Sequence, residues 1–138
     1  ISPDLSLRQV DDVLMLIRKT GFEGIIASNT STTRRDLGTA TEKIAAIGQG
    51  GLSGKPLTNR TVKMISYICK QTGHEIPVIG VGGIMNEADA LRLIKAGASL
   101  VQVYTGFIYE GPLLIRRINK TLQNYRTQGR DQSLQAKN

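Results

Sequence analysis

Four groups of polar and glycine residues have the types and spacing of a site for a planar, phosphorylated ligand. Ser28-Asn29-Thr30 offers an amide and two hydroxyl groups as hydrogen-bond donors and acceptors. Three glycine-containing segments follow it, at 50–57, 80–84 and 104–106. Glycine has no Cβ, so backbone N–H groups there can approach a ligand closely. Taken alone, each group is weak evidence, because Asn and Thr often bond only to their own turn and diglycine turns are common.

The elements that must position these groups alternate between short apolar runs and amphipathic stretches, which is the pattern of parallel βα units. Buried parallel strands are predicted at 24–28, 77–81 and 100–103. Helices are predicted at 6–20, at 58–72, at 86–96, over one turn at 105–109, and from 111 to about 126. The long polar connection at 29–57 is predicted to be a functional loop, since compact domains rarely contain long loops without a function.

The number of βα units indicates a part of a larger fold. Three complete units and the end of an earlier strand at Ile1-Ser2 fall short of the eight units and about 250 residues of a closed (β/α)8 barrel. Three such apolar strands alone would leave bare edges. We therefore predict an α/β fold in which 1–126 is the C-terminal part of a (β/α)8 TIM barrel and 127–138 is a frayed polar tail. An N-terminal half, from the same or a separate chain, would complete the barrel; a small open α/β sheet is the alternative.

Composition excludes several classes of function. The 138 residues carry a net charge of +7, but the basic residues are scattered, and two Phe, four Tyr and no Trp provide no stacking surface for bases. No nucleic-acid partner is expected. A lone cysteine, Cys69, and a lone histidine, His74, cannot form a Cys/His metal site, and we expect the first in the core and the second at the surface. No apolar run reaches the about 20 residues of a membrane span, and no secretory signal is expected.

The last two glycine segments follow consecutive strands, where barrels commonly bind phosphate. We expect the helix capped by Asn86 to present its N-terminus to that phosphate and Gly83 to let the phosphate approach the backbone. Lys55 would either reach the phosphate or be solvated. A phosphorylated cofactor would thus lie across the mouth of the barrel, with substrate beside it near 28–30.

These segments, taken in order, resemble the C-terminal part of the dihydroorotate dehydrogenases: SNT, GGLSGKPL, IPVIGVGGI, AGASLVQVYTG and GFIYEGP. The ending QVYTGFIYEGP resembles the membrane-associated class that uses a quinone. The resemblance implies an FMN enzyme of de novo pyrimidine (UMP) biosynthesis that oxidises dihydroorotate to orotate and reduces a quinone. It implies FMN contacts from Ser28, Gly54, Gly83, Tyr104 and Thr105, and orotate contacts from Asn29 and Thr30.

The resemblance also implies that the catalytic base and the membrane-contacting part of the enzyme lie outside these residues. The family's serine base belongs to the N-terminal half and its lysine would precede Ile1, so no catalytic residue is assigned here. Membrane contact would be peripheral and made by the N-terminal part, on the cytoplasmic face of a bacterial cell membrane or, alternatively, at a mitochondrial inner membrane. Two other functions stay open: an FMN barrel like the tRNA-dihydrouridine synthases, and a non-catalytic phosphate-binding fragment.

Overall fold

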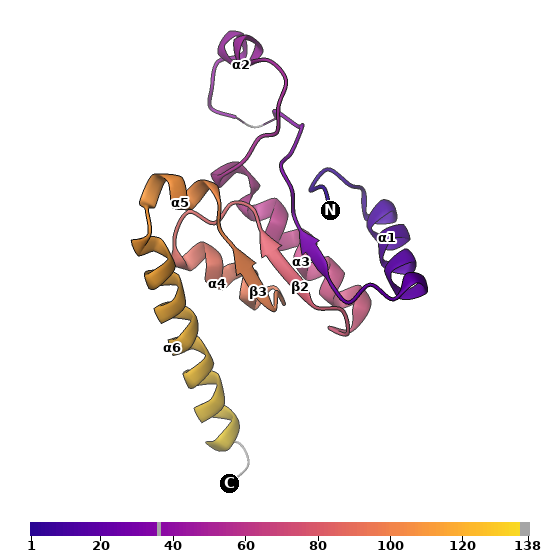
Figure 1. The fold of residues 1–138 in the computed structure, drawn as a ribbon, viewed down its shortest axis with the longest axis vertical. Coiled ribbons are helices and arrows are strands. Elements are labelled where there is room, and N and C mark those ends of the chain that lie inside the picture. Colours follow the sequence, from indigo (N-terminus) through magenta and orange to yellow (C-terminus); the bar gives the residue numbers. More distant parts are fainter. Residues whose placement is uncertain (36, 136–138) are drawn as a thin grey trace.

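Three parallel strands form the centre of the fold (Figure 1). The computed structural model describes residues 1–35 and 37–135, with side chains up to residue 129. The strands are β1 (Ile25–Ala27), β2 (Val78–Val81) and β3 (Leu100–Gln102), hydrogen-bonded in the order β1-β2-β3. The helices are α1 (Leu7–Thr20), α2 (Thr41–Ile47), the 3-10 turn η1 (Lys55–Leu57), α3 (Thr58–Thr72), α4 (Glu87–Lys95), α5 (Thr105–Glu110) and α6 (Leu113–Gln135). Each predicted strand and helix is present.

Local signals in the sequence explain where the helices begin and end. At the start of α1 the Ser6 hydroxyl accepts a hydrogen bond from the Gln9 amide, and the Gln9 side chain accepts one from the Ser6 amide, which together form a capping box. Gly21 ends α1 and Gly73 ends α3, both with left-handed backbone conformations that glycine adopts without strain.

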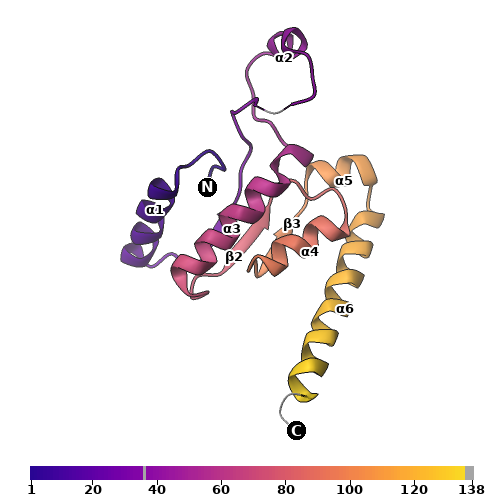
Figure 2. The same ribbon diagram turned by 180° about the vertical axis from the view of Figure 1, so that it is seen from behind.

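The hydrophobic core lies between one face of the sheet and the helices α3 and α4, which cover that face in the view from behind (Figure 2). The fully buried side chains include Ile65 and Ile68 from α3, Leu93 from α4 and Val78 from β2. Cys69 is buried in the same cluster, as predicted. Burial against two helices anchors the strands, and the strand ends carry the site.

The other face of the sheet is apolar and open within the described residues. Ile26 is 47% exposed and Leu100 is 60% exposed. Along the edge of β1, the Ile1 carbonyl accepts a hydrogen bond from the Asn29 amide at 2.9 Å, and the Ile1 nitrogen donates to the Ile26 carbonyl at 2.7 Å. Residue 1 therefore pairs with β1, as predicted for the end of an earlier strand. An apolar inner face and strands that continue sideways are features of a barrel segment.

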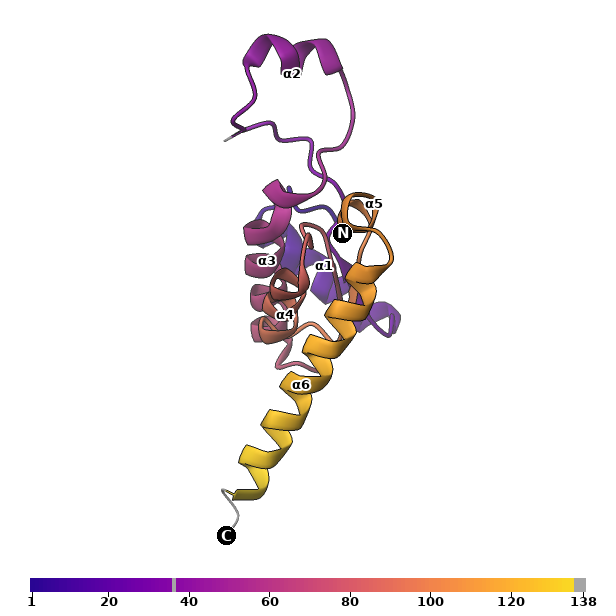
Figure 3. The same cartoon turned by 90° about the vertical axis from the view of Figure 1, so that its left-hand side faces the viewer.

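Two segments differ from the prediction. A short helix, α2, lies within the long connection and projects away from the sheet (Figure 3). It has no capping side chain and buries no residue, so no local sequence signal predicts it. Helix α6 continues to Gln135, so the expected frayed tail from 127 is wrong for 127–135, and 136–138 lie outside the described residues. The buried stripe of a helix can end before its backbone hydrogen bonds do, because residues such as Gln and Arg favour helix without burial.

Asp4 ties both ends of the long connection to the body of the fold. Its carboxylate accepts hydrogen bonds from the Ser31 hydroxyl at 2.6 Å and the Thr32 amide at 2.7 Å, and it lies 2.9 Å from the Arg60 guanidinium on α3. Ser31 also pairs with Leu52 across the neck of the loop. The hydrogen bond from Ser31, with smaller contributions from Thr32 and Arg60, lowers the pKa of Asp4 from 3.8 to about 2.

Replacing Asp4 by Asn is expected to lower the free energy of unfolding by about 1–3 kcal/mol at neutral pH, because hydrogen bonds to a charged acceptor are lost. Since folding lowers this pKa, the contribution is complete above the unfolded value of 3.8 and is lost as the pH falls through about 2. Urea unfolding across that acidic range measures the gap, which is the difference in free energy of unfolding between wild type and Asp4→Asn. The exposed Asp12 on α1, changed to Asn, is the control; a gap that does not shrink on acidification would contradict the role of the Asp4 charge.

Candidate cofactor and substrate site

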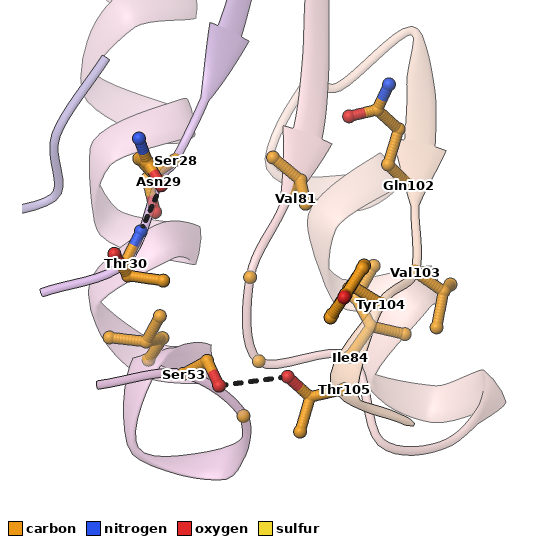
Figure 4. A pocket seen from close by; sticks show the side chains of 14 residues that line it. Ser28, Asn29, Thr30, Ser53, Val81, Ile84, Gln102, Val103, Tyr104 and Thr105 are labelled. Atoms are coloured by element: carbon orange, nitrogen blue, oxygen red, sulfur yellow. Dashed lines mark hydrogen bonds between the residues drawn. The ribbon is translucent and has the colours of Figure 1, made fainter. Parts of the chain in front are cut away.

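One cavity of about 180 Å³ opens at the C-terminal ends of the three strands (Figure 4). All the predicted site residues line it: Ser28, Asn29, Thr30, Gly54, Gly83, Tyr104 and Thr105. They are joined there by Ser53, Leu57, Val81, Gly82, Ile84, Gln102 and Val103. This volume is below the about 300–1,000 Å³ of most ligand sites, as expected where part of a barrel supplies one wall of a site. None of the lining residues is Lys, Arg, His, Asp or Glu, so this wall binds through hydrogen bonds and apolar contact.

The end of β1 provides one side of the cavity. The Ser28 amide donates to the Val81 carbonyl at 2.6 Å, and the buried Ser28 hydroxyl lies 3.2 Å from that of Thr61. Asn29 is exposed, and its Oδ1 accepts from the Thr30 amide at 2.7 Å. That bond orients the Asn29 side chain so that its Nδ2 is the group that can donate to a ligand.

The glycine-rich segment 50–57 closes a second side. The Ser53 hydroxyl lies 3.1 Å from the Thr105 hydroxyl at the start of α5, across the mouth of the cavity (Figure 4). A Cβ at Gly51 would lie 2.0 Å from Thr30 Oγ1, so only glycine lets this loop pass the end of β1. A Cβ at Gly54 would lie 3.1 Å from Thr105 Cγ2. The loop is therefore packed against the groups that line the cavity.

The turn after β2 packs on the first turn of α3, which gives a second reason for glycine at position 83, and its expected role at the phosphate stays a prediction. A Cβ at Gly83 would lie 2.3 Å from the Thr58 backbone nitrogen, and φ is +79°. The Thr58 hydroxyl donates to the Gly83 carbonyl at 2.6 Å. Glycine is required here by α3, whether or not a ligand is bound.

No residue of helix α4 lines the cavity, so the expectation that its N-terminus faces a phosphate stays a prediction. Asn86 accepts from the Asp89 amide at 2.9 Å, and the Asp89 carboxylate accepts from the Met85 amide at 3.2 Å. Side chains of the chain itself thus satisfy amides at this end. The backbone that lines the cavity belongs to the turn at 82–84 and to the start of α5.

Sequence reasoning also missed supporting residues. Lys55 neither lines the cavity nor is merely solvated: its Nζ lies 3.1 Å from both carboxylate oxygens of Asp89. Thr58 and Thr61, both buried, hold the turn after β2 and the end of β1. Their signal was present, because they are polar residues at i and i+3 on the buried face of α3.

Three further residues, Cys69, His74 and Arg34, lie outside the lining of the cavity. Burial raises the pKa of the Cys69 thiol, which disfavours a reactive thiolate. His74 is exposed just after α3, as predicted. Arg34 donates to the carbonyls of Ser31 and Gly50 and so crosses the neck of the long loop. Over the described part of the chain, no group of three or more His, Cys, Asp or Glu side chains could hold a metal ion.

Comparison with known proteins identifies the family. The sequence profile of the family described as "Dihydroorotate dehydrogenase" matches residues 1–125. The chain belongs to this family. Relatives named "Dihydroorotate dehydrogenase (quinone)" include one from Chloroflexus aurantiacus, 47% identical over 122 residues (88% of this chain and 33% of the relative). Another, from Nostoc punctiforme, is 49% identical over 124 residues (86% of this chain and 32% of the relative).

The fold of the dihydroorotate dehydrogenases is shared as well. The crystal structure of the Eimeria tenella protein in complex with ferulenol superposes with a TM-score of 0.82 at 37% identity, covering 94% of this chain and 34% of that one. The chain spans about a third of the length of the relatives that it matches. The prediction of an α/β fold that is the C-terminal part of a (β/α)8 barrel is confirmed. In the region that the structure describes, no helix combines the length and the apolar character that crossing a bilayer requires.

Gly83→Ala is expected to lower the free energy of unfolding by about 1–3 kcal/mol more than Gly21→Ala, because the new Cβ overlaps the Thr58 backbone. Gly21 is a matched control: its φ is +74° against +79° at Gly83, and a Cβ there meets nothing within 4 Å. Denaturant unfolding of both variants in the absence of flavin isolates this contact from any ligand effect. Equal losses in the two variants would show that backbone strain alone requires glycine.

Proposed function

We propose that this chain supplies the FMN-phosphate site and part of the orotate site of an enzyme that oxidises dihydroorotate to orotate, with a quinone as electron acceptor, in de novo pyrimidine biosynthesis. The main support for this proposal is one structural observation. Residues from the ends of β1 and β3, the glycine-rich loop and the turn after β2 converge on one cavity at the C-terminal edge of the strands. This is the edge at which barrel enzymes place their sites, and the named relatives are quinone-type dihydroorotate dehydrogenases.

The lining of the cavity fits FMN in chemical character. Apolar side chains such as Val81 and Ile84 suit the face of a flavin ring, while the Thr105 hydroxyl and the backbone at 82–84 suit a phosphate. When bound, FMN accepts a hydride from the substrate. In the proposed arrangement, Ser28, Gly54 and Tyr104 contact the cofactor, and Gly83 to Thr105 surround its phosphate.

Asn29 and Thr30 would hold the substrate ring at the end of β1. Oδ1 of Asn29 accepts a hydrogen bond from the Thr30 amide, so in this proposal Nδ2 of Asn29 donates to a ring carbonyl. The Thr30 hydroxyl adds a second hydrogen bond to the ring. Two fixed groups from adjacent residues orient a planar ring, which is the main contribution a binding wall makes to a hydride transfer. We assign no proton-abstracting residue to this chain.

The remaining strands of the barrel would cover the open face of the sheet. The exposed Ile26 and Leu100 and the pairing of Ile1 along β1 support completion by an N-terminal half, from the same chain or another. Quinone binding and peripheral attachment to the cytoplasmic face of a bacterial cell membrane are proposed for that half.

Flavin absorbance of the protein with its complete barrel tests the function. We expect a yellow protein whose flavin bleaches when dihydroorotate is added without oxygen and recovers its colour when a quinone is added. Bound flavin that does not respond to dihydroorotate would favour a tRNA-dihydrouridine synthase-like enzyme. Absence of flavin from the intact protein would favour a non-catalytic phosphate-binding role.

Asn29→Ala is expected to weaken orotate binding about tenfold or more while FMN stays bound, because one oriented donor to the substrate is lost and the cofactor contacts are not. Titration with orotate, followed by the shift of the flavin spectrum, measures the dissociation constant, and the flavin-to-protein ratio measures retention. The exposed Asn124 on α6, changed to Ala, is the control. Loss of flavin together with orotate affinity would contradict the assignment of Asn29 to the substrate.

A further inference from the structure

An ion pair between Lys55 and Asp89 connects two walls of the cavity from outside it. The Lys55 ammonium lies 3.1 Å from each oxygen of the Asp89 carboxylate. Asp89 is only 3% exposed, whereas the Lys55 side chain is 62% exposed. Neither residue lines the cavity, so any effect on a ligand must pass through the neighbours of each.

Those neighbours stand on two sides of the proposed phosphate site. Lys55 directly follows Gly54, which lines the cavity. Asp89 lies on the first turn of α4 and accepts from the Met85 amide, two residues beyond Gly83. The ion pair therefore links the glycine-rich loop to the turn after β2.

The ion pair adds to the contacts that already hold this glycine-rich loop at Gly50 and Leu52. Glycine-rich segments lose more conformational entropy on ordering than other segments do. Across the cavity mouth, this loop meets the body through the hydroxyl contact between Ser53 and Thr105. A charge pair with one nearly buried partner is screened less by solvent than a pair on the surface. Arg92 is a second cation, 3.8 Å from Asp89, and it donates to Asn59 Oδ1 at 2.6 Å. It therefore links α4 to the start of α3, whereas Lys55 links α4 to the glycine-rich segment itself.

We propose that Lys55 and Asp89 are positioning residues that fix the spacing between the Ser53-Gly54 wall and the wall formed by Gly83 and Thr105, and that tight binding of the phosphate end of the flavin depends on this spacing. The inference rests on the proposed function, since it assigns the phosphate to these walls. The proposal predicts different behaviour for two flavins. Binding of riboflavin, which lacks the phosphate, does not depend on the spacing.

The test compares the dissociation constants of FMN and riboflavin, measured by quenching of flavin fluorescence on the flavin-free protein with its complete barrel. Lys55→Met is expected to weaken FMN binding about tenfold and riboflavin binding by less than about twofold. Lys55→Arg retains the ion pair and is expected to restore FMN affinity. Lys70→Met is the control, because it removes the same charge from an exposed position at the far end of α3.

A double variant separates tethering from the cost of an unpaired buried carboxylate. Lys55→Met with Asp89→Asn removes both charges, and tethering predicts FMN binding as weak as in Lys55→Met alone. Recovery of FMN affinity in the double variant, or equal weakening of FMN and riboflavin in Lys55→Met, would overturn the proposal. If Lys55→Met does not fold, Lys55→Gln replaces it, because its amide can still donate to Asp89. The ratio of the FMN dissociation constant to that of riboflavin is then expected to rise about threefold. An unchanged ratio would overturn the proposal equally. Wild-type protein that binds neither flavin would instead refute the proposed function.

Discussion

Two buried hydroxyl groups on the first turns of α3 hold the site together. Thr61 contacts the Ser28 hydroxyl at the end of β1, and Thr58 donates to the Gly83 carbonyl in the turn after β2. Both side chains are buried, and a buried polar group left without its partner costs about 1–3 kcal/mol. The position of α3 relative to the sheet therefore fixes both strand ends at once. These two hydrogen bonds, made on the same helix, help to hold two sides of the cavity in place.

Local sequence signals predicted the elements and the composition of the cavity well. Short apolar runs bounded by glycine and proline indicated the strands, and the capping box at Ser6 fixed the start of α1. The site residues could be predicted to converge because the C-terminal ends of parallel strands share one edge. Long-range packing was not predictable: the overlap between a Cβ at Gly83 and Thr58, and the pairing of Lys55 with Asp89, depend on residues far apart in sequence. Helix α2 buries no residue, and residues 123–129 of α6 are exposed, so neither segment has a buried apolar stripe that a periodicity could show.

The absence of full charges from the lining described here determines how this wall can bind. Hydroxyl groups, an amide side chain and backbone dipoles provide its polar contacts, and apolar side chains provide the rest. Such contacts depend on exact distances, whereas attraction between full charges acts over a Debye length of about 8–10 Å. A wall of this kind discriminates by shape, and its precision comes from the supporting residues behind it. The buried carboxylate of Asp89 and the threonines of α3 belong to that support.

The neck of the long connection separates the lobe beyond it from the rest of the fold. Ser31 pairs with Leu52, Asp4 and Arg60 hold the same point, and Arg34 bridges to Gly50, so the lobe between them, including α2, is closed at its base. The entropic free-energy cost of closing a loop rises only with the logarithm of the loop's length, by about 0.6 kcal/mol for each doubling. A change in the length of the lobe therefore costs little free energy of folding. A peptide inserted into α2 would therefore leave the residues that line the cavity in place.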